Sequence, residues 1–178
     1  MLTNLLVALG LSFPLVAPAS PAGRFFTRPS IQSAVAVYIA VVGITYALLL
    51  RHLWNPQGPQ KIADVSLHDV VPVLYHGFWT IFVPKAMLRW NLALRWLAYP
   101  IACMVYTVMH GLVSGWYPYY SLLLSPTTPY IYRCQLLGFP RALANAAGML
   151  VAFFALGLLI VAIDRASDKK SLSSATTE

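Results

Sequence analysis

The chain has 178 residues, of which 59% are hydrophobic and only 10% are charged, and its formal net charge is +7. Because about a quarter of the residues in soluble domains are charged, this composition excludes an ordinary water-soluble fold. The basic residues stand at the ends of apolar stretches and not in one block, which favours lipid headgroups and argues against a nucleic-acid partner. We therefore expect an all-α fold, a polytopic transmembrane bundle of about five helices.

Five apolar stretches are expected to form these helices. In chain order they cover about 2–18, 31–54, 66–84, 94–112 and 142–164. Four of them are close in length to the helix of about 20 residues that crosses a bilayer core, and the first is shorter. The first also ends in small residues and proline, as a secretory signal does, but no Lys or Arg precedes it, which favours an uncleaved helix. The bundle should occupy 1–165, followed by a disordered cytoplasmic tail over 166–178.

The distribution of Lys and Arg predicts how the helices are oriented. If all five cross the membrane, one side receives eight basic residues: Arg24, Arg28, Lys85, Arg89, Arg95, Arg165, Lys169 and Lys170. The other side receives four: Arg51, Lys61, Arg133 and Arg141. The richer side should be cytoplasmic, so the N-terminus is expected outside and the C-terminus inside. The Tyr-rich segment 113–141 would then cap the outer face, with Trp116, Tyr117, Tyr119 and Tyr120 at headgroup depth.

Most polar residues of the expected helices fall at their outer ends. Ionisable groups inside a bilayer are costly and usually face a protein interior or a wet cavity. Their common depth therefore predicts a shared polar pocket that opens to the outer leaflet. The residues concerned are Thr3, Asn4, Arg51, His52, His68, Asp69, His110 and Asn145.

Helical periodicity adds two polar and aromatic stripes. His68, Tyr75 and Trp79 fall within about 20° of one line on the third helix. A similar stripe on the fourth helix contains Arg95, Tyr99, Tyr106 and His110, and the two stripes could face each other across the bundle.

The same residues also have plain structural interpretations. His68 follows Asp64 and Ser66, which are possible N-caps, so it could be an interfacial residue wetted by headgroups. Thr3, taken alone, is an ordinary helix-start residue. No GxSxG elbow, HExxH pair, P-loop or dinucleotide-binding glycine pattern occurs in the sequence, so the chemistry of common soluble enzymes gains no support.

Four segments together carry a family resemblance. LTNLLVAL, LRHLWNPQGPQK, LHDVVPVLYHGFW and GWYPYYSLL, in this order, resemble the androgen-induced-protein family of six-helix membrane proteins, particularly its short bacterial relatives. The resemblance covers about residues 2–165. It implies a hydrolase of fatty-acid esters of hydroxy fatty acids in the plasma membrane of a bacterium. The family helix that precedes the Thr segment has no counterpart before Met1 in this sequence.

The resemblance also implies which residues act. The family nucleophile lies in an F-L-T segment that Met1-Leu2-Thr3 matches, and the family histidine lies at a helix start that His68-Asp69-Val70-Val71-Pro72 matches. His68 would take the proton of Thr3, which attacks the ester carbonyl. Asp69, Tyr106 or His110 would orient the imidazole or polarise the carbonyl. This chemistry implies no cofactor, and its partners are the lipid bilayer and a lipid-like substrate.

Two other functions remain open from the sequence. In the first, a zinc-dependent lipid hydrolase, His52, His68, His110 and Asp69 would converge on the metal, although no helix carries a two-ligand spacing. In the second, the protein is not an enzyme but a small lipid or hydrophobe carrier or a structural membrane protein, and its polar residues satisfy helix ends.

Overall fold

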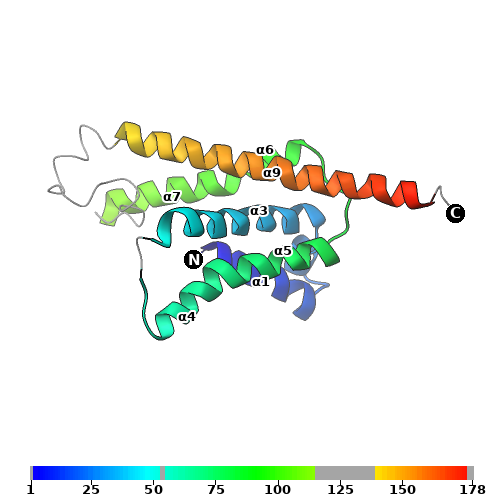
Figure 1. Ribbon diagram of the computed structural model, residues 1–178, viewed down its shortest axis with the longest axis horizontal. Helices are drawn as coiled ribbons and strands as arrows, with labels where there is room; N and C mark the ends of the chain where they lie inside the picture. Colours follow the sequence, from blue (N-terminus) through cyan, green and yellow to red (C-terminus); the bar gives the residue numbers. More distant parts are fainter. Residues whose placement is uncertain (1, 53–54, 115–138, 176–178) are drawn as a thin grey trace. The chain divides into compact units, whose positions relative to one another are not determined.

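The computed structural model describes residues 2–52, 55–114 and 139–175, and over these residues the chain is helical without any strand (Figure 1). The prediction of an all-α fold is confirmed for this part of the chain. The helices are α1 (Leu2–Val16), α2 (Pro21–Phe26), α3 (Pro29–Thr45), α4 (Pro59–Val65), α5 (Val71–Phe82), α6 (Asn91–Arg95), α7 (Ala98–Ser114) and α9 (Phe139–Ala175). Two π-helical turns, η1 (Tyr46–Leu50) and η2 (Ser66–Val70), continue α3 and join α4 to α5.

Each of the five expected apolar stretches contains a helix, but several boundaries differ. The third helix begins at Pro59 and not near 66, because proline is favoured in the first turn of a helix. Gly58 precedes it with φ 57°, a conformation that only glycine adopts without cost. At the C-terminus α9 is helical as far as Ala175, so it enters the segment 166–178 that was expected to be a disordered tail. No Gly or Pro after residue 164 interrupts that helix.

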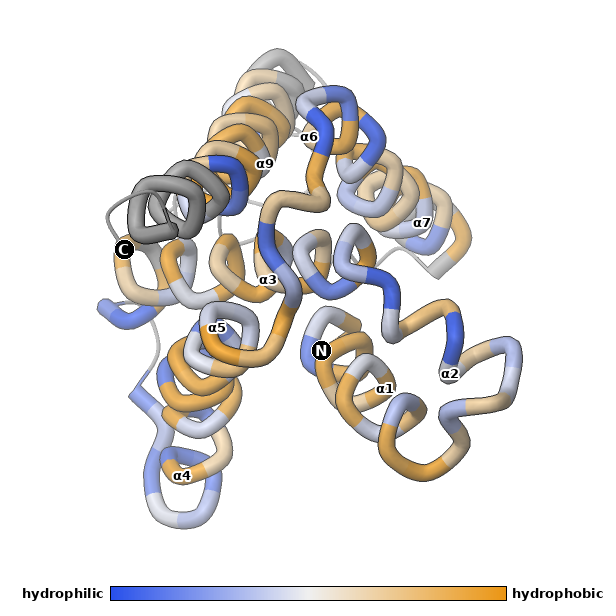
Figure 2. Tube along the Cα trace, turned by 90° about the vertical axis from the view of Figure 1, so that its right-hand side faces the viewer, coloured by the Kyte–Doolittle hydropathy of each residue, from blue (hydrophilic) through white to orange (hydrophobic). Residues whose placement is uncertain are grey.

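Within the described residues, three helices are long and apolar enough to cross a membrane. They cover Pro29–Leu48, Asn91–His110 and Ala144–Ser167, and α1 is a shorter apolar helix. Figure 2 shows hydrophobic residues along α1, α7 and α9, and hydrophilic residues in α4 and in several connections between helices. Length and composition are thus suited to a membrane at three places, while α1 and α5 fall below the length of a full crossing.

The described chain divides into two compact units, each with its own contacts. Unit 1 contains residues 1–93 and 156–178, and unit 2 contains residues 94–155. Unit 1 holds α1 to α5 and the C-terminal part of α9. Unit 2 holds α7 and the N-terminal part of α9, with a shallow apolar groove of about 220 Å³ lined by Leu94, Leu97, Leu150, Val151 and Phe154.

Helix α3 forms the core of unit 1. Every residue from Gln32 to Ile39 is buried, so α3 is covered on all sides over two turns. Helix α1 packs on it and buries Val7 and Gly10, and α5 packs on it through Tyr75 and Trp79. A helix buried all round must satisfy its polar side chains inside the protein.

The aromatic stripe of α5 donates one hydrogen bond to a polar side chain of α3 and one to its backbone. Trp79 Nε1 donates to Ser33 Oγ at 2.8 Å, and Tyr75 Oη donates to the Gln32 carbonyl at 3.2 Å. The stripe that periodicity predicted on the third helix therefore exists, and it faces α3. In contrast, Val73, Leu74 and Ile81 of α5 are 65–74% exposed, which gives α5 an outward apolar face suited to lipid.

A buried carboxylate ties the segment after α5 to α9. Asp164, only 1% exposed, accepts the Leu88 backbone N–H on Oδ2 at 3.0 Å. Its backbone carbonyl accepts the Ala86 N–H at 3.2 Å, and Ala86 has φ 65°. These bonds hold the segment after α5 beside Asp164 of α9, within unit 1.

Candidate functional site

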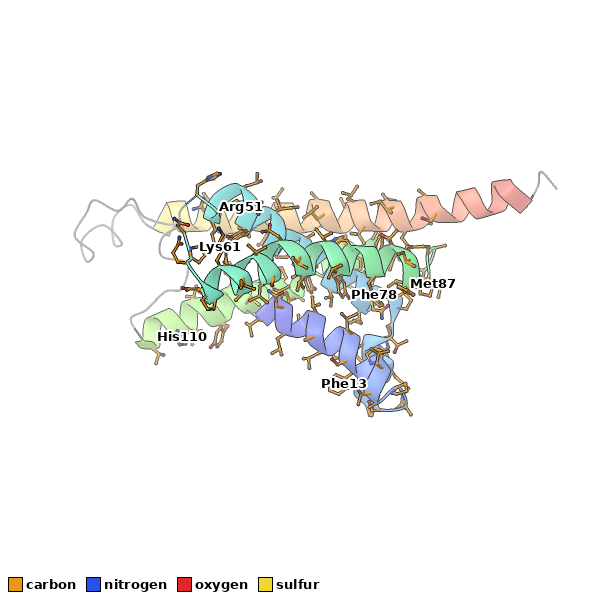
Figure 3. All side chains as sticks on the ribbon, turned by 60° about the horizontal axis from the view of Figure 1, so that its bottom comes forward. Phe13, Arg51, Lys61, Phe78, Met87 and His110 are labelled. Atoms are coloured by element: carbon orange, nitrogen blue, oxygen red, sulfur yellow. The ribbon has the colours of Figure 1, made fainter. Side chains whose placement is uncertain are left out.

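Polar side chains of unit 1 gather where α3 continues into η1 and where α4 continues through η2. We refer to Tyr46, Arg51, Asp64, His68 and Asp69 as the polar cluster. In Figure 3, Arg51 and Lys61 lie together near this end of the α4–α5 helix, and Phe78 and Met87 lie towards its other end. The cluster is therefore confined to one end of unit 1.

His68 is held by Asp64 and Tyr46. Its Nδ1 lies 2.9 Å from the Asp64 carbonyl oxygen and 3.2 Å from Asp64 Oδ1. Its ring stacks on Tyr46 with the centroids 4.4 Å apart and the planes 13° apart. Tyr46 Oη donates a hydrogen bond to Asp64 Oδ2, so one carboxylate holds both rings. An acceptor at Nδ1 favours the tautomer with the proton on Nδ1 and leaves Nε2 as the basic nitrogen.

The other two members of the cluster form an ion pair. Arg51 Nη2 binds Asp69 Oδ1, and the two side chains are 49% and 35% exposed. The Arg51 guanidinium also lies 5.5 Å from the centroid of the Tyr46 ring. An exposed pair of this kind contributes less than about 1 kcal/mol to stability. Asp69, expected as a support for His68, thus binds Arg51 here, and Asp64 occupies the supporting position.

Two π-helical turns and a glycine create this arrangement. Both η1 and η2 interrupt the regular α-helical ladder at the cluster, and single π turns occur frequently at functional sites. Gly43 lets α3 approach closely, because a Cβ there would lie 3.2 Å from Pro72 Cβ and 3.3 Å from the His68 carbonyl oxygen. The backbone of His68 is therefore packed directly against α3.

Thr3 and Asn4 lie in the first turn of α1. Helix α1 packs on α3 and runs in the opposite direction (Figure 1), so its N-terminal end lies towards the part of α3 that leads into Tyr46. Thr3 is half-buried. Asn4 Oδ1 is buried and, among the described residues, has no hydrogen-bond partner. The pairing of Thr3 with His68 stays a prediction.

Tyr106 and His110, the other expected supports, both lie on α7 in unit 2. Their ring centroids are 5.8 Å apart with the planes tilted by 39°, as the predicted stripe requires. Both side chains are exposed. Their role beside His68 also stays a prediction. Trp116, Tyr117, Tyr119, Tyr120 and the GWYPY segment lie outside the described residues.

The metal alternative gains no geometric support. Within residues 2–52, 55–114 and 139–175, no group of three or more His, Cys, Asp or Glu side chains is placed to hold an ion. Of the four proposed ligands, His68 binds Asp64 and Asp69 binds Arg51.

Sequence reasoning missed two members of the cluster. The sequence pattern indicates Asp64 only as a possible N-cap, and nothing in it singles out Tyr46. The spacing of Asp64 and His68 does carry a signal, because residues four apart on a helix lie on the same face and can interact. No comparable local signal marks Tyr46, since it comes from another helix.

Comparison with models of known families, with curated proteins and with solved structures gives no match to this chain. The resemblance to the androgen-induced-protein family therefore stays a prediction from the four sequence segments.

Proposed function

We propose that the protein is a membrane-embedded lipid esterase in which His68 is the general base and Thr3 is the nucleophile. The observation that carries this proposal is the contact of His68 Nδ1 with Asp64. A base whose far nitrogen is fixed by a third group is the arrangement that activates hydroxyl nucleophiles. The family resemblance supplies Thr3.

The proposed reaction has two steps. First, His68 Nε2 takes the proton from Thr3 Oγ1, and Oγ1 attacks the carbonyl carbon of the ester. The imidazolium, stabilised by Asp64, then gives that proton to the leaving alkoxide, and the acyl group stays on Thr3. Second, His68 takes a proton from water, which attacks the acyl carbonyl carbon. The bond between that carbon and Thr3 Oγ1 breaks, Oγ1 takes the proton from the imidazolium, and the fatty acid leaves. The protein needs no cofactor for this sequence.

Asn4 supports a ligand site beside Thr3. A buried polar atom without a partner costs about 1–3 kcal/mol, and its Oδ1 is such an atom in the described residues. A hydroxyl from a bound lipid would satisfy it. The substrate class proposed from the resemblance, esters of hydroxy fatty acids, contains such a group once the ester is cleaved.

The proposal includes a membrane arrangement. Five helices would cross or enter the plasma membrane of a bacterium, with the N-terminus outside, the C-terminus cytoplasmic and the polar cluster towards the outer leaflet. Three helices of sufficient length and apolar composition support it. The outward apolar face of α5 supports it as well, because Val73, Leu74 and Ile81 would be poorly placed in water.

Labelling with a fluorophosphonate tests the proposal. The detergent-solubilised chain should be labelled covalently, and Thr3→Ala should abolish the label. His68→Ala should slow labelling by about 10²–10⁴-fold, the range expected for a general base. Asp64→Asn should slow it by about tenfold or more, because the carboxylate no longer stabilises the imidazolium.

Asp69→Asn is the matched control. It removes one carboxylate next to His68 in sequence, but Asp69 binds Arg51 and not the imidazole. Labelling should change little. Unlabelled wild-type protein that circular dichroism shows to be helical would reject the esterase, as would labelling that survives in Thr3→Ala.

A non-catalytic role is the second candidate. It is favoured by the partners that each cluster side chain already has within the protein, since these bonds tie η1 to η2. On this alternative, Asp64→Asn and His68→Ala lower thermal stability and change no labelling, because there is none.

A further inference from the structure

The end of unit 1 opposite the polar cluster carries exposed cations. They come from three separate parts of the chain: Arg24 and Arg28 lie in and just after α2, Arg89 lies after α5, and Arg165 lies in α9. We call these four residues the basic rim. All four side chains are exposed.

Helix packing brings these parts to one end. Arg28 lies just before α3, and Ser33 near the start of α3 accepts the hydrogen bond from Trp79 near the end of α5. The chain after α5 is then tied to α9 through Leu88 and Asp164. Figure 2 looks onto this end and shows hydrophilic residues beside α2 and along the segment from α5 to α6.

Two of the four rim arginines lie over aromatic rings. The Arg28 guanidinium lies 5.9 Å from the centroid of Phe25, and the Arg165 guanidinium lies 5.8 Å from that of Trp90. Phe25 and Trp90 are 44% and 51% exposed. Guanidinium groups over exposed rings are suited to the boundary between water and lipid, where aromatic side chains are enriched.

Among the side chains that the structure describes at this end, no carboxylate is paired with a rim arginine. Among the side chains described at this end, the one carboxylate is Asp164, which is 1% exposed and binds the Leu88 N–H. The polar cluster differs, because its guanidinium, Arg51, is bound by Asp69. Among the described side chains, the rim arginines therefore have no carboxylate partner, whereas Arg51 of the polar cluster has one.

Lys85 lies at the same end but has a structural role. Its Nζ donates to the Val83 carbonyl at 2.9 Å and to the Trp79 carbonyl, which caps the C-terminus of α5. Burial lowers the pKa of its ammonium group, and the charge of Asp164 opposes that shift. Lys85 is thus turned into the protein and is not part of the rim.

We propose that the basic rim binds the headgroups of anionic phospholipids and selects them over zwitterionic ones. The rim borders exposed apolar side chains, including Met87 at 63%, and it adjoins the span Pro29–Leu48. Those neighbours fit a bilayer surface and would be poorly matched to a nucleic acid or an acidic protein. Each basic residue near an anionic surface adds about 1 kcal/mol, which is about fivefold in lipid preference.

Lipid retained during purification tests this site. The full chain is purified in detergent with equal amounts of phosphatidylglycerol and phosphatidylcholine, and the lipids that elute with it are quantified by mass spectrometry. Wild-type protein should retain phosphatidylglycerol in clear excess. Replacing all four rim arginines by glutamine should bring the ratio to that of the free mixture, and each single Arg→Gln change should reduce it by about fivefold or less.

Two controls make the result decisive. Lys61→Gln removes one charge at the opposite end and should leave the ratio unchanged, whereas replacing the four arginines by lysine keeps the charge and should preserve the excess. A fourfold glutamine variant with the wild-type ratio would overturn the proposal. So would an equal loss in Lys61→Gln. If the fourfold variant does not fold, the single variants decide the matter by the same criterion.

Discussion

Replacing Gly43 by alanine should destabilise the protein, whereas replacing Gly77 by alanine should stabilise it. Both are helical glycines of unit 1, but a Cβ on Gly43 would meet Pro72 Cβ at 3.2 Å and the His68 carbonyl oxygen at 3.3 Å, whereas a Cβ on Gly77 would meet nothing within 4 Å. A proline ring and a backbone carbonyl cannot rotate away, so α3 and η2 must separate. Such overpacking costs about 1–3 kcal/mol.

Helix propensity works in the other direction. Replacing glycine by alanine inside a helix stabilises it by about 1 kcal/mol. Gly43→Ala should therefore destabilise unit 1 by as much as about 2 kcal/mol, the overpacking cost less the propensity gain. Gly77→Ala should stabilise it by about 0.5–1 kcal/mol. For a chain of this size each kcal/mol shifts Tm by about 2–4 °C.

Thermal unfolding of both variants in the same detergent, followed by circular dichroism, checks this difference. Gly43→Ala should melt below the wild type and Gly77→Ala above it. Because the clash falls on the His68 backbone, Gly43→Ala should also slow any fluorophosphonate labelling. If Gly43→Ala melts at or above the temperature of Gly77→Ala, the close packing of α3 on η2 is wrong.

Three further predictions concern unit 1. Trp79→Phe removes the 2.8 Å bond to Ser33 and should cost about 1–3 kcal/mol, and adding Ser33→Ala should cost little more in a double-mutant cycle of urea unfolding. Asp164→Ala leaves the buried Leu88 N–H without its acceptor and should lower the free energy of unfolding by about 1–3 kcal/mol, whereas Asp164→Asn should restore most of it. Gly23→Ala places a Cβ 2.9 Å from Pro18 Cα and should reduce folded yield in detergent-solubilised membranes, as seen by size-exclusion chromatography.

The helices were predictable because their signal is local. Apolar stretches of about 20 residues are visible without knowledge of the fold, and each stretch did contain a helix. The start of the third helix at Pro59 was harder to predict from the sequence. The residues that follow it include the polar Gln60, Lys61 and Asp64, so this segment has no apolar pattern. They are helical because Pro59 starts a helix that η2 and α5 continue.

The partner of the α5 stripe was not predictable in the same way. Periodicity placed His68, Tyr75 and Trp79 on one face, but it did not show what that face meets. In the structure it meets α3, through Gln32 and Ser33, because a helix that is apolar on every side takes the central position.

The polar cluster contains one contact that was predictable from local spacing and others that were not, because they join different helices. Asp64 and His68 are four residues apart, so their contact follows from the helix. Tyr46 and Arg51 come from the end of α3, where η1 forms. No residue type in the sequence predicts such a π-helical turn. Asp69 is the nearest carboxylate to His68 in sequence, yet at one residue's distance it points to a different face of the helix and binds Arg51.

Charge is satisfied differently at the two ends of unit 1, and this difference suits the two proposed ligands. At the polar cluster the Arg51 guanidinium is paired with Asp69, and Asp64 binds the neutral imidazole of His68. An ester carbonyl is uncharged and needs an oriented base more than it needs a net charge. At the basic rim the guanidinium groups of Arg28 and Arg165 rest on rings, which do not cancel their charge. A permanent anion such as a phospholipid headgroup therefore gains more binding free energy at the basic rim than at the polar cluster. The uncharged ester has no such preference for the rim.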